Sequence, residues 1–342
     1  MNGSMNCRKK INPMKKLAVI LTLCAATGCL LLAGCSKSKN APTKSGNSAD
    51  SSVASATADG PVEMRIKWTV GKKYMMRMEM KQGTETKLPD QPQPMKAAVN
   101  LSQDFDISAL KELDNGGRQL EFEFENETMD VSQAGRNVLS FDSAQSSAQD
   151  ANNPVAAGLR AIIGVPIQFF TDADGKVQKI EGVDELMNRI AATGKPQQQA
   201  MFKQMFGEDT LKQYGSFGEM MPNREVNIGE SWPVKKDIVS SVGVLTVDMK
   251  YTFKNWEQHG DRKCAHIEAA GDISTKSVSN ASGAVVEIEK GKISGDVWFD
   301  PELGMVVDVN NDQTIKMKVT TRAQTVTPQL TQKIRVTLLD VQ

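Results

Sequence analysis

The sequence predicts an α+β protein that is mostly antiparallel β, with two similar curved sheets and a short helical segment between them. Three observations lead to this prediction. Apolar and polar residues alternate over long stretches, a helical pattern interrupts the alternation in mid-chain, and three glycine-centred landmarks occur twice in the same order. Alternation with a period of two is typical of half-buried antiparallel strands.

The chain opens with the features of a bacterial export signal. The first 16 residues hold five basic and no acidic residues, and residues 17–34 carry no charge. A basic start, an apolar core and a small-residue exit are typical of a secretory signal. We therefore expect residues 1–34 to be a signal peptide that starts at Met1, Met5 or Met14.

The apolar run ends at Leu32-Ala33-Gly34-Cys35, which resembles the lipobox of bacterial lipoproteins. In that family the cysteine sulfur receives a diacylglycerol, so the resemblance implies a membrane anchor on Cys35. The alternative is an uncleaved signal anchor, because the run is long enough to cross a bilayer. Two acyl chains hold a protein at a membrane, and the absence of Asp at position 36 favours the outer membrane. We expect a lipid-anchored protein of the cell envelope, facing the periplasm.

Composition narrows the function classes. The whole chain has 41 basic and 41 acidic residues, and loss of the signal would leave 36 basic residues, for a net charge of about −5. A negative net charge speaks against nucleic-acid partners. Cys264 would be the one free thiol after lipidation of Cys35, so no internal disulfide is expected, and a domain of this size does not need one.

Three further segments follow the predicted anchor. Residues 35–60 form the lipidated cysteine and a tether, which holds seven Ser and no aromatic residue and is expected to be disordered. Residues 61–182 form the first β-rich half, in which Met76, Met78 and Met80 alternate with charged residues on one strand. These methionines either pack into the core or form an adaptable apolar surface for a lipid or a protein partner, because methionine side chains reshape easily.

The helical segment is expected over residues 183–221, and the second β-rich half over residues 222–342. Apolar residues of the helical segment recur at helical spacing. Such a stripe either joins the core or lines a pocket. Together with the methionines of the first half, they are the candidate residues that face an apolar ligand: Met76, Met78, Met80, Met201, Phe202, Met205 and Phe206.

Three paired landmarks suggest an internal duplication. Val70-Gly71-x-x-Tyr74 matches Ile228-Gly229-x-x-Trp232, a turn at 114–118 matches one at 258–262, and Phe170-x4-Gly175-x-Val177 matches Phe299-x4-Gly304-x-Val306. Glycine turns between strands are common, so the shared order carries more weight than any single match. The alternative is coincidence among hairpins.

The order of these segments resembles an uncharacterised family of bacterial lipoproteins known as a domain of unknown function. The resemblance rests on the lipobox, the Ser-rich tether, VGKKY, FFTDADGKVQKIEG, MPNREVNIGESW and GDVWFDPELGMVVDV. It covers residues 61–340 and implies a β-rich envelope domain without catalytic residues to carry over. More loosely, the strand-rich halves are similar to periplasmic lipoprotein carriers, whose half-open barrel holds acyl chains.

The sequence offers no catalytic residues, metal site or cofactor motif. TDADGKV (171–177) has spaced carboxylates, but Phe170 would occupy the first ligand position of a calcium loop, so a hairpin turn fits better. The only histidines, His259 and His266, would supply zinc ligands together with Cys264, but no fourth ligand is suggested. No nucleophile elbow, zinc-protease, Walker or dinucleotide motif is present. We expect no enzymatic activity.

The functional prediction is a non-catalytic module that binds an apolar or lipid ligand. The alternative is a structural or protein-interaction module of the cell envelope with no small-molecule ligand, and an unrecognised hydrolase is the third possibility. A cavity at the predicted methionine and phenylalanine positions would favour the first, and an exposed apolar patch on a filled core the second. A cleft with a histidine beside an acid and a serine would favour the third.

Overall fold

The computed structural model describes residues 60–88, 91–193, 199, 202–203, 206–240, 243–277, 285–321 and 324–342. The predicted signal peptide, Cys35 and all but the last residue of the tether lie outside these ranges, as do Met201 and Met205. Within the ranges, no helix has the length and apolar character needed to cross a membrane.

The described residues form long strands and a few short helices. The first part of the chain contains β1 (Val62–Met64), β2 (Lys73–Lys87), β3 (Met95–Glu112), β4 (Arg118–Gln133), β5 (Arg136–Asp142), β6 (Ile167–Thr171) and β7 (Val177–Glu181). The helical elements are η1 (Ser147–Asn152), α2 (Pro154–Ile162), α3 (Val183–Thr193), α5 (Glu208–Tyr214) and η2 (Phe217–Met220). The second part contains β8 (Arg224–Val226), β9 (Ser231–Ser240), β10 (Gly243–His259), β11 (Arg262–Ser277), β12 (Val285–Asp300), β13 (Met305–Thr320) and β14 (Thr325–Val341).

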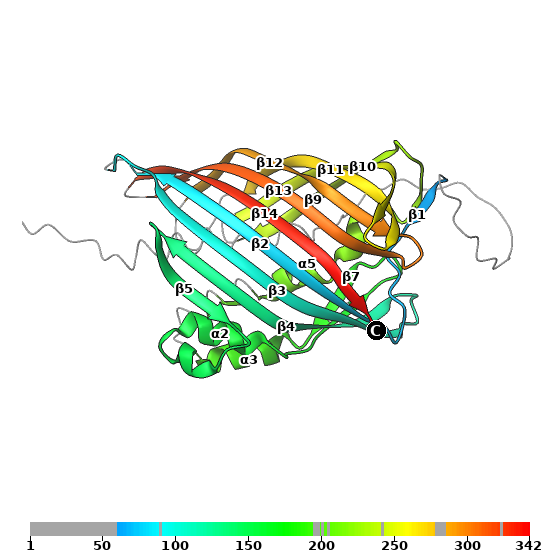
Figure 1. Cartoon of the computed structure of the whole chain (residues 1–342), viewed down its shortest axis with the longest axis horizontal. Coiled ribbons are helices and arrows are strands. Elements are labelled where there is room, and N and C mark those ends of the chain that lie inside the picture. The colour runs from blue at the N-terminus through cyan, green and yellow to red at the C-terminus, as the bar shows by residue number, and fades with distance from the viewer. Residues whose placement is uncertain are drawn as a thin grey trace, which may run out of the picture.

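A 12-stranded antiparallel sheet dominates the structure (Figure 1). Its strand order is β7-β6-β4-β3-β2-β14-β13-β12-β11-β10-β9, with β5 paired to β4, while β1 and β8 form a separate two-stranded sheet. The predicted class, mostly antiparallel β with short helices, is confirmed. The two β-rich halves of the chain join within the large sheet, where β2 pairs with β14.

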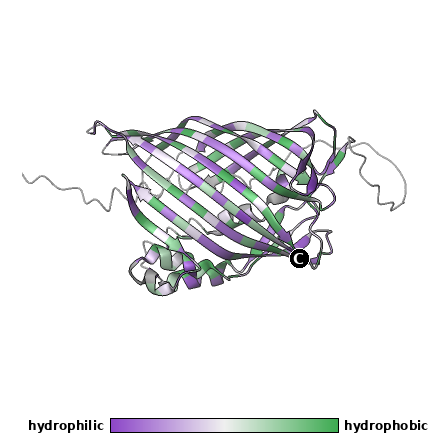
Figure 2. Cartoon of the chain, in the orientation of Figure 1, coloured by the Kyte–Doolittle hydropathy of each residue, from purple (hydrophilic) through white to green (hydrophobic). Residues whose placement is uncertain are grey.

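The long strands alternate between buried and exposed residues, as the sequence pattern predicts. On β2, Tyr74, Met76, Met78 and Met80 are buried, while the charged residues between them are exposed or half-buried. We call the face that carries these four residues the inner face of the sheet and the opposite face the outer face. Bands of hydrophobic and hydrophilic residues cross the strands in Figure 2. The curved sheet thus gathers its apolar side chains into one hydrophobic core.

The predicted duplication is visible in the backbone. Strands β2-β3-β4-β6-β7 pair in sequence as an antiparallel meander, and β9-β10-β11-β12-β13 form a second meander in the same order. The amide of Gly71 donates to the Ala109 carbonyl at 2.8 Å, and that of Gly229 to the Phe253 carbonyl at 2.7 Å. Both glycines have positive φ, 84° and 83°, which glycine adopts without steric cost. The two halves therefore follow one backbone plan.

Aromatic residues of the helical segment contact the inner face of the first meander. Phe206 lies 5.9 Å from Phe124 between ring centroids, and Tyr214 of α5 lies 5.2 Å from Phe122. Tyr214 also contacts Phe105 on β3. These rings bury this part of the inner face, because aromatic side chains cover large areas where they pack together.

Helix α2 lies inside residues 61–182, where the sequence pattern indicated only strands. It begins with Pro154, and the side chain of Asn153 caps it by accepting from the amides of Val155 and Ala156. Gly158 on this helix faces the ring of Phe202 so closely that an added Cβ would lie 2.2 Å from it. The glycine therefore lets α2 approach Phe202.

The TDADGKV segment is the hairpin turn that the sequence predicts. It joins β6 to β7, and the Asp172 carboxylate accepts from the amides of Asp174 and Lys176 at 3.1 and 2.9 Å. Asp300 holds the equivalent turn between β12 and β13 by accepting from the amides of Glu302 and Leu303. Both acidic residues shape turns.

Candidate functional site

The structure buries five of the seven predicted ligand-facing residues in one hydrophobic core. Met76, Met78 and Met80 follow one another along the inner face of β2, and we call them the methionine stripe. Phe202 and Phe206 are also buried and stack on each other with ring centroids 6.2 Å apart. Met201 and Met205 fall outside the described residues.

A row of three glutamines crosses the inner face immediately beyond the methionine stripe. Gln82 on β2 lies opposite Gln332 on β14, which lies opposite Gln313 on β13. We call these three residues the glutamine row. Their side chains are 3%, 1% and 2% exposed, respectively. Burial of an amide is unfavourable unless hydrogen bonds replace those it made to water.

Most polar atoms of the glutamine row have no hydrogen-bond partner. Gln332 Nε2 donates to Gln82 Oε1 at 3.3 Å and lies 2.8 Å from Met80 Sδ. Gln82 Nε2, Gln332 Oε1 and both polar side-chain atoms of Gln313 lack a partner. Asn311 Oδ1 and Thr84 Oγ1, on the same face, are also unpaired. A buried polar group without a partner costs about 1–3 kcal/mol, so a bound group that supplies partners would stabilise this region.

A second polar pair lies on the inner face of β3 and β4. Gln103 Nε2 donates to the Glu127 carboxylate at 3.1 Å, while Gln103 Oε1 is unpaired. A β-bulge at Glu125 shifts the register, so Phe124 and Glu127 both face inward although they are three residues apart. Bulges commonly redirect side chains in this way. Burial raises the pKa of Glu127 to about 7, and the hydrogen bond from Gln103 offsets only part of that rise.

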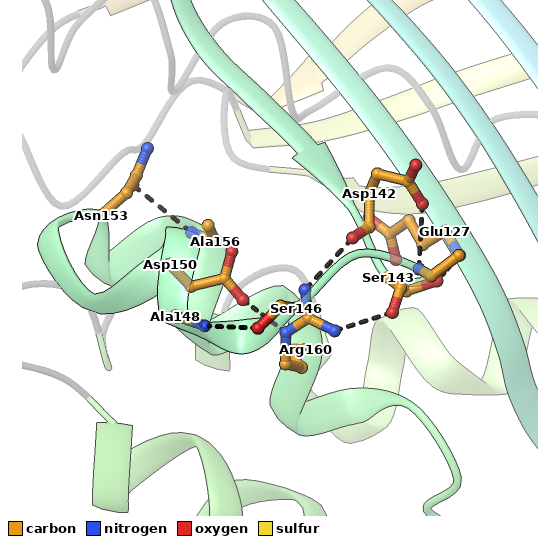
Figure 3. Close-up of polar contacts among 10 residues, drawn as sticks. Glu127, Asp142, Ser143, Ser146, Ala148, Asp150, Asn153, Ala156 and Arg160 are labelled. Atoms are coloured by element: carbon orange, nitrogen blue, oxygen red, sulfur yellow. Dashed lines mark hydrogen bonds and ion pairs between the residues drawn. The ribbon is translucent and has the colours of Figure 1, made fainter.

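The backbone of Glu127 fixes the corner where η1 and α2 meet the sheet (Figure 3). Its amide donates to Ser143 Oγ at 2.9 Å, and the Ser143 amide donates to the Glu127 carbonyl at 2.9 Å. Arg160 of α2 pairs with Asp150 and donates to the carbonyls of Ser143 and Asp142 at 2.7 and 3.1 Å. Arg160 is thus engaged by Asp150 and the loop, and the Glu127 carboxylate faces Gln103 instead.

Buried positive charge is absent from the described part of the chain, where no Lys or Arg is among the buried residues. Buried acids other than Glu127 have basic partners, in the pairs Lys73–Asp106, Arg160–Asp150, Arg262–Asp300 and Arg335–Asp308. Lys236 on the edge strand β9 is half-buried and pairs with Glu219 at 3.2 Å. Around the glutamine row, the inner face therefore presents amides and a hydroxyl in an apolar surrounding.

Both histidines lie on the outer face, away from the glutamine row. They stack on Trp298 with ring centroids 4.3 Å (His259) and 5.3 Å (His266) away. His259 Nε2 lies 3.1 Å from Asp308, and His266 Nε2 lies 2.8 Å from Asp296. Cys264 is fully buried, and desolvation raises the pKa of its thiol to about 12. Over the residues that the structure describes, no group of three or more His, Cys, Asp or Glu is placed to hold a metal ion.

The chain belongs to a family of unknown function, DUF6263, whose model matches residues 115–326. The match confirms the resemblance to an uncharacterised family. The lipobox-like residues and the VGKKY strand lie outside the matched range. No curated protein matches the chain.

Two solved structures superimpose on the chain in part. A structure of lipovitellin, which describes its lipid–protein interactions, is similar with a TM-score of 0.44 and 10% sequence identity, over 81% of this chain and 26% of that one. A protein from Bacteroides fragilis, assigned as exported and with a YmcC-like fold, is similar with a TM-score of 0.26 and 10% identity, over 82% of this chain and 99% of that one. This chain thus spans about a quarter of the lipovitellin chain.

Proposed function

We propose that the protein is a non-catalytic binding module that holds an apolar or lipid ligand against the inner face of its sheet. The observation that carries the proposal is the group of buried, unpaired polar atoms centred on the glutamine row. These atoms lie beside the methionine stripe, on the face that also carries the Gln103–Glu127 pair. A face that served only as a core would be more stable with apolar residues at these positions.

The unpaired atoms of the inner face carry an energetic cost. Seven unpaired atoms belong to residues of the inner face: Gln82, Thr84, Gln103, Asn311, Gln313 and Gln332. Each of these groups costs about 1–3 kcal/mol when nothing pairs with it. A ligand that supplies hydrogen-bond partners would recover part of this free energy.

The methionine stripe is the proposed contact for the apolar part of the ligand. Methionine is unbranched and polarizable, so its side chain adapts to irregular apolar shapes. Met76, Met78 and Met80 follow one another along one strand, from Met76, which lies opposite Phe105, to the glutamine row. Because these side chains are 1–5% exposed, an acyl chain would reach the stripe by displacing the side chains that cover it, and the methionines would repack around the acyl chain.

The anchor at Cys35 belongs to the same proposal. The basic start, the apolar run and Leu32-Ala33-Gly34-Cys35 support export and lipid attachment, and we place the module at the outer membrane, facing the periplasm. Mass spectrometry of the N-terminal peptide of the envelope protein tests this. We expect a diacylated Cys35, and a peptide that retains residues 1–34 without lipid would contradict it.

Fluorescence titration tests the binding function. N-phenyl-1-naphthylamine, an uncharged apolar probe that brightens in apolar surroundings, is added to the protein purified from the cell envelope. We expect saturable binding at one site, which Met78→Trp on the inner face blocks by filling space. Met75→Trp, on the outer face of the same strand, is the matched control and should leave binding intact. Equal binding by both variants, or no saturable binding, would favour the envelope structural module instead.

A further inference from the structure

We propose that the ligand carries an uncharged polar headgroup with both hydrogen-bond donors and acceptors, as in a glyceryl ester, and that the glutamine row holds this headgroup. The inference rests on the proposed function and specifies which class of apolar ligand the inner face accepts. Three properties of the described residues support it.

The first property is the mixture of donors and acceptors. Each glutamine amide offers an N–H₂ donor and a carbonyl acceptor, and in this row both kinds of atom are left unpaired. Gln82 Nε2 and Gln313 Nε2 are unpaired donors, while Gln332 Oε1 and Gln313 Oε1 are unpaired acceptors. Hydroxyl groups donate and accept at once, so neighbouring hydroxyls on a headgroup would satisfy both kinds.

The second property is the absence of a counter-charge for an anion. None of the buried residues in the described ranges is Lys or Arg, and half-buried Lys236 is paired with Glu219. A phosphate or carboxylate headgroup on the inner face would therefore be a desolvated, unpaired charge, which is strongly unfavourable. The charge pattern selects against anionic lipids.

The third property is the position of the one buried acid without an ion pair. A cationic headgroup would be drawn to the Glu127 carboxylate. Glu127 lies opposite Gln103, and Gln103 lies opposite Met78. Gln82 lies four residues further along β2, and Val99 is its neighbour on β3. The glutamine row is therefore separated from the carboxylate and is itself uncharged.

The order of residues along β2 also orients the ligand. Met76, Met78 and Met80 precede Gln82 and Thr84 on the same face. A headgroup at the glutamine row would leave its acyl chain on the methionine stripe, directed toward the aromatic cluster at Phe105 and Tyr214. Polar and apolar parts of one amphiphile would then each meet matching side chains.

Displacement of N-phenyl-1-naphthylamine by ligands that share one acyl chain tests the inference. The competitors are 1-monooleoylglycerol, oleate and methyl oleate, which differ only in the headgroup. We expect monooleoylglycerol to displace the probe at about a tenfold lower concentration than either of the others, since one or two net hydrogen bonds correspond to that factor.

Leucine variants of the glutamine row provide the matched comparison. Gln332→Leu should abolish the preference for monooleoylglycerol while methyl oleate binds as before. It should leave the melting temperature of the ligand-free protein nearly unchanged, because removal of the unpaired Oε1 is offset by loss of the hydrogen bond to Gln82 Oε1. Gln329→Leu is the control, since Gln329 is exposed on the outer face of the same strand. It should change neither property.

The outcomes separate the two proposals. If the probe and all three competitors fail to bind, the proposed function is wrong and the inference fails with it. If all three competitors bind equally, or oleate binds best, the binding function stands and the headgroup inference is overturned. If Gln332→Leu lowers the melting temperature and keeps the preference, the glutamines pair with one another as a structural ladder, which also overturns the inference.

Discussion

The two meanders share a backbone plan but differ in what they present to the inner face. The first meander places Gln82, Gln103 and Glu127 among its buried side chains, and β13 of the second meander and β14 add further amides beside it. On β10 of the second meander, the buried side chains are instead Leu245, Val247, Met249, Tyr251 and Phe253. The same glycine turns and strand order support both surfaces.

This difference separates what the fold requires from what it does not. Since β10 of the second meander forms with apolar residues where its counterpart β3 carries Gln103, the backbone plan does not need a buried amide at that strand. Natural sequences depart from consistent core chemistry mainly where function demands it. The polar residues of the first meander and of β13 and β14 are therefore the best candidates for ligand contacts.

The largest expected effect comes from the aromatic residues of each meander. Phe122 and Phe253 are both 0% exposed, and replacing either by Ala should lower the free energy of unfolding by about 3–5 kcal/mol. Because β2 pairs with β14 within one sheet, both variants should still unfold in a single transition, measured by circular dichroism in denaturant. Separate transitions for the two halves would contradict the description of one continuous sheet.

The next effect concerns Glu127 and has a defined pH dependence. Its pKa rises from 4.5 in the unfolded chain to about 7 in the folded protein, so the folded state binds this proton more tightly. The protonated Glu127 carboxyl group therefore stabilises the folded state at low pH. This stabilisation is lost as the pH rises through 7, and the free energy of unfolding falls by about 3 kcal/mol in total. Glu127→Gln should remove this pH dependence.

Urea unfolding at a series of pH values measures the Glu127 effect. Above pH 7 the Gln variant should be the more stable protein, and its new amide would also face the unpaired Gln103 Oε1. Asp130→Asn, on the exposed face of the same strand, is the control and should keep the wild-type pH dependence. An identical pH profile for Glu127→Gln and wild type would show that the carboxyl group is not desolvated.

A reciprocal exchange of polarity sharpens the comparison of the two surfaces. Gln313→Leu should stabilise the ligand-free protein by about 1–2 kcal/mol, because both polar atoms of Gln313 are unpaired. Val247→Gln, on the inner face of β10, should destabilise the protein by about 1–3 kcal/mol, because it buries a new amide without hydrogen-bond partners. Chemical denaturation measures both, and destabilisation by Gln313→Leu would mean that the glutamine has a structural partner.

The smallest expected effect tests whether the two meanders share one backbone plan. Gly71 and Gly229 occupy equivalent turns with nearly equal positive φ, and an added Cβ meets no atom within 4 Å at either position. Alanine at each site should therefore cost about 1–2 kcal/mol through backbone conformation alone. Thermal melts should show equal losses for the two variants, whereas clearly unequal losses would argue against equivalent turns.

The fold was largely predictable because its signals are local. Period-two alternation identified the strands, the TDADGKV hairpin was recognised from its turn residues, and the paired Gly71 and Gly229 motifs indicated the duplication. Helix α2 was missed because it is only nine residues long and has little room for a helical period. The burial of Met76, Met78 and Met80 followed directly from their alternation.

The polar part of the candidate site was not predictable, because its signals are non-local. Gln82 continues the alternation of the methionine stripe, and this alternation could have identified it as a buried residue. The surrounding residues KQGTETK, however, resemble the solvated end of a strand. Its partner Gln332 is 250 residues away and joins it only through the pairing of β2 with β14. Glu127 was hidden by the bulge at Glu125, which reverses the parity that Phe122 and Phe124 set.

Native mass spectrometry of the protein purified from the cell envelope tests the central claim most directly. We predict a stoichiometric adduct of lipid mass, one per chain, which is restored by 1-monooleoylglycerol after delipidation and reduced in Gln332→Leu. A bare protein mass in every preparation, unchanged after incubation with monooleoylglycerol, would contradict the claim that the inner face binds a ligand.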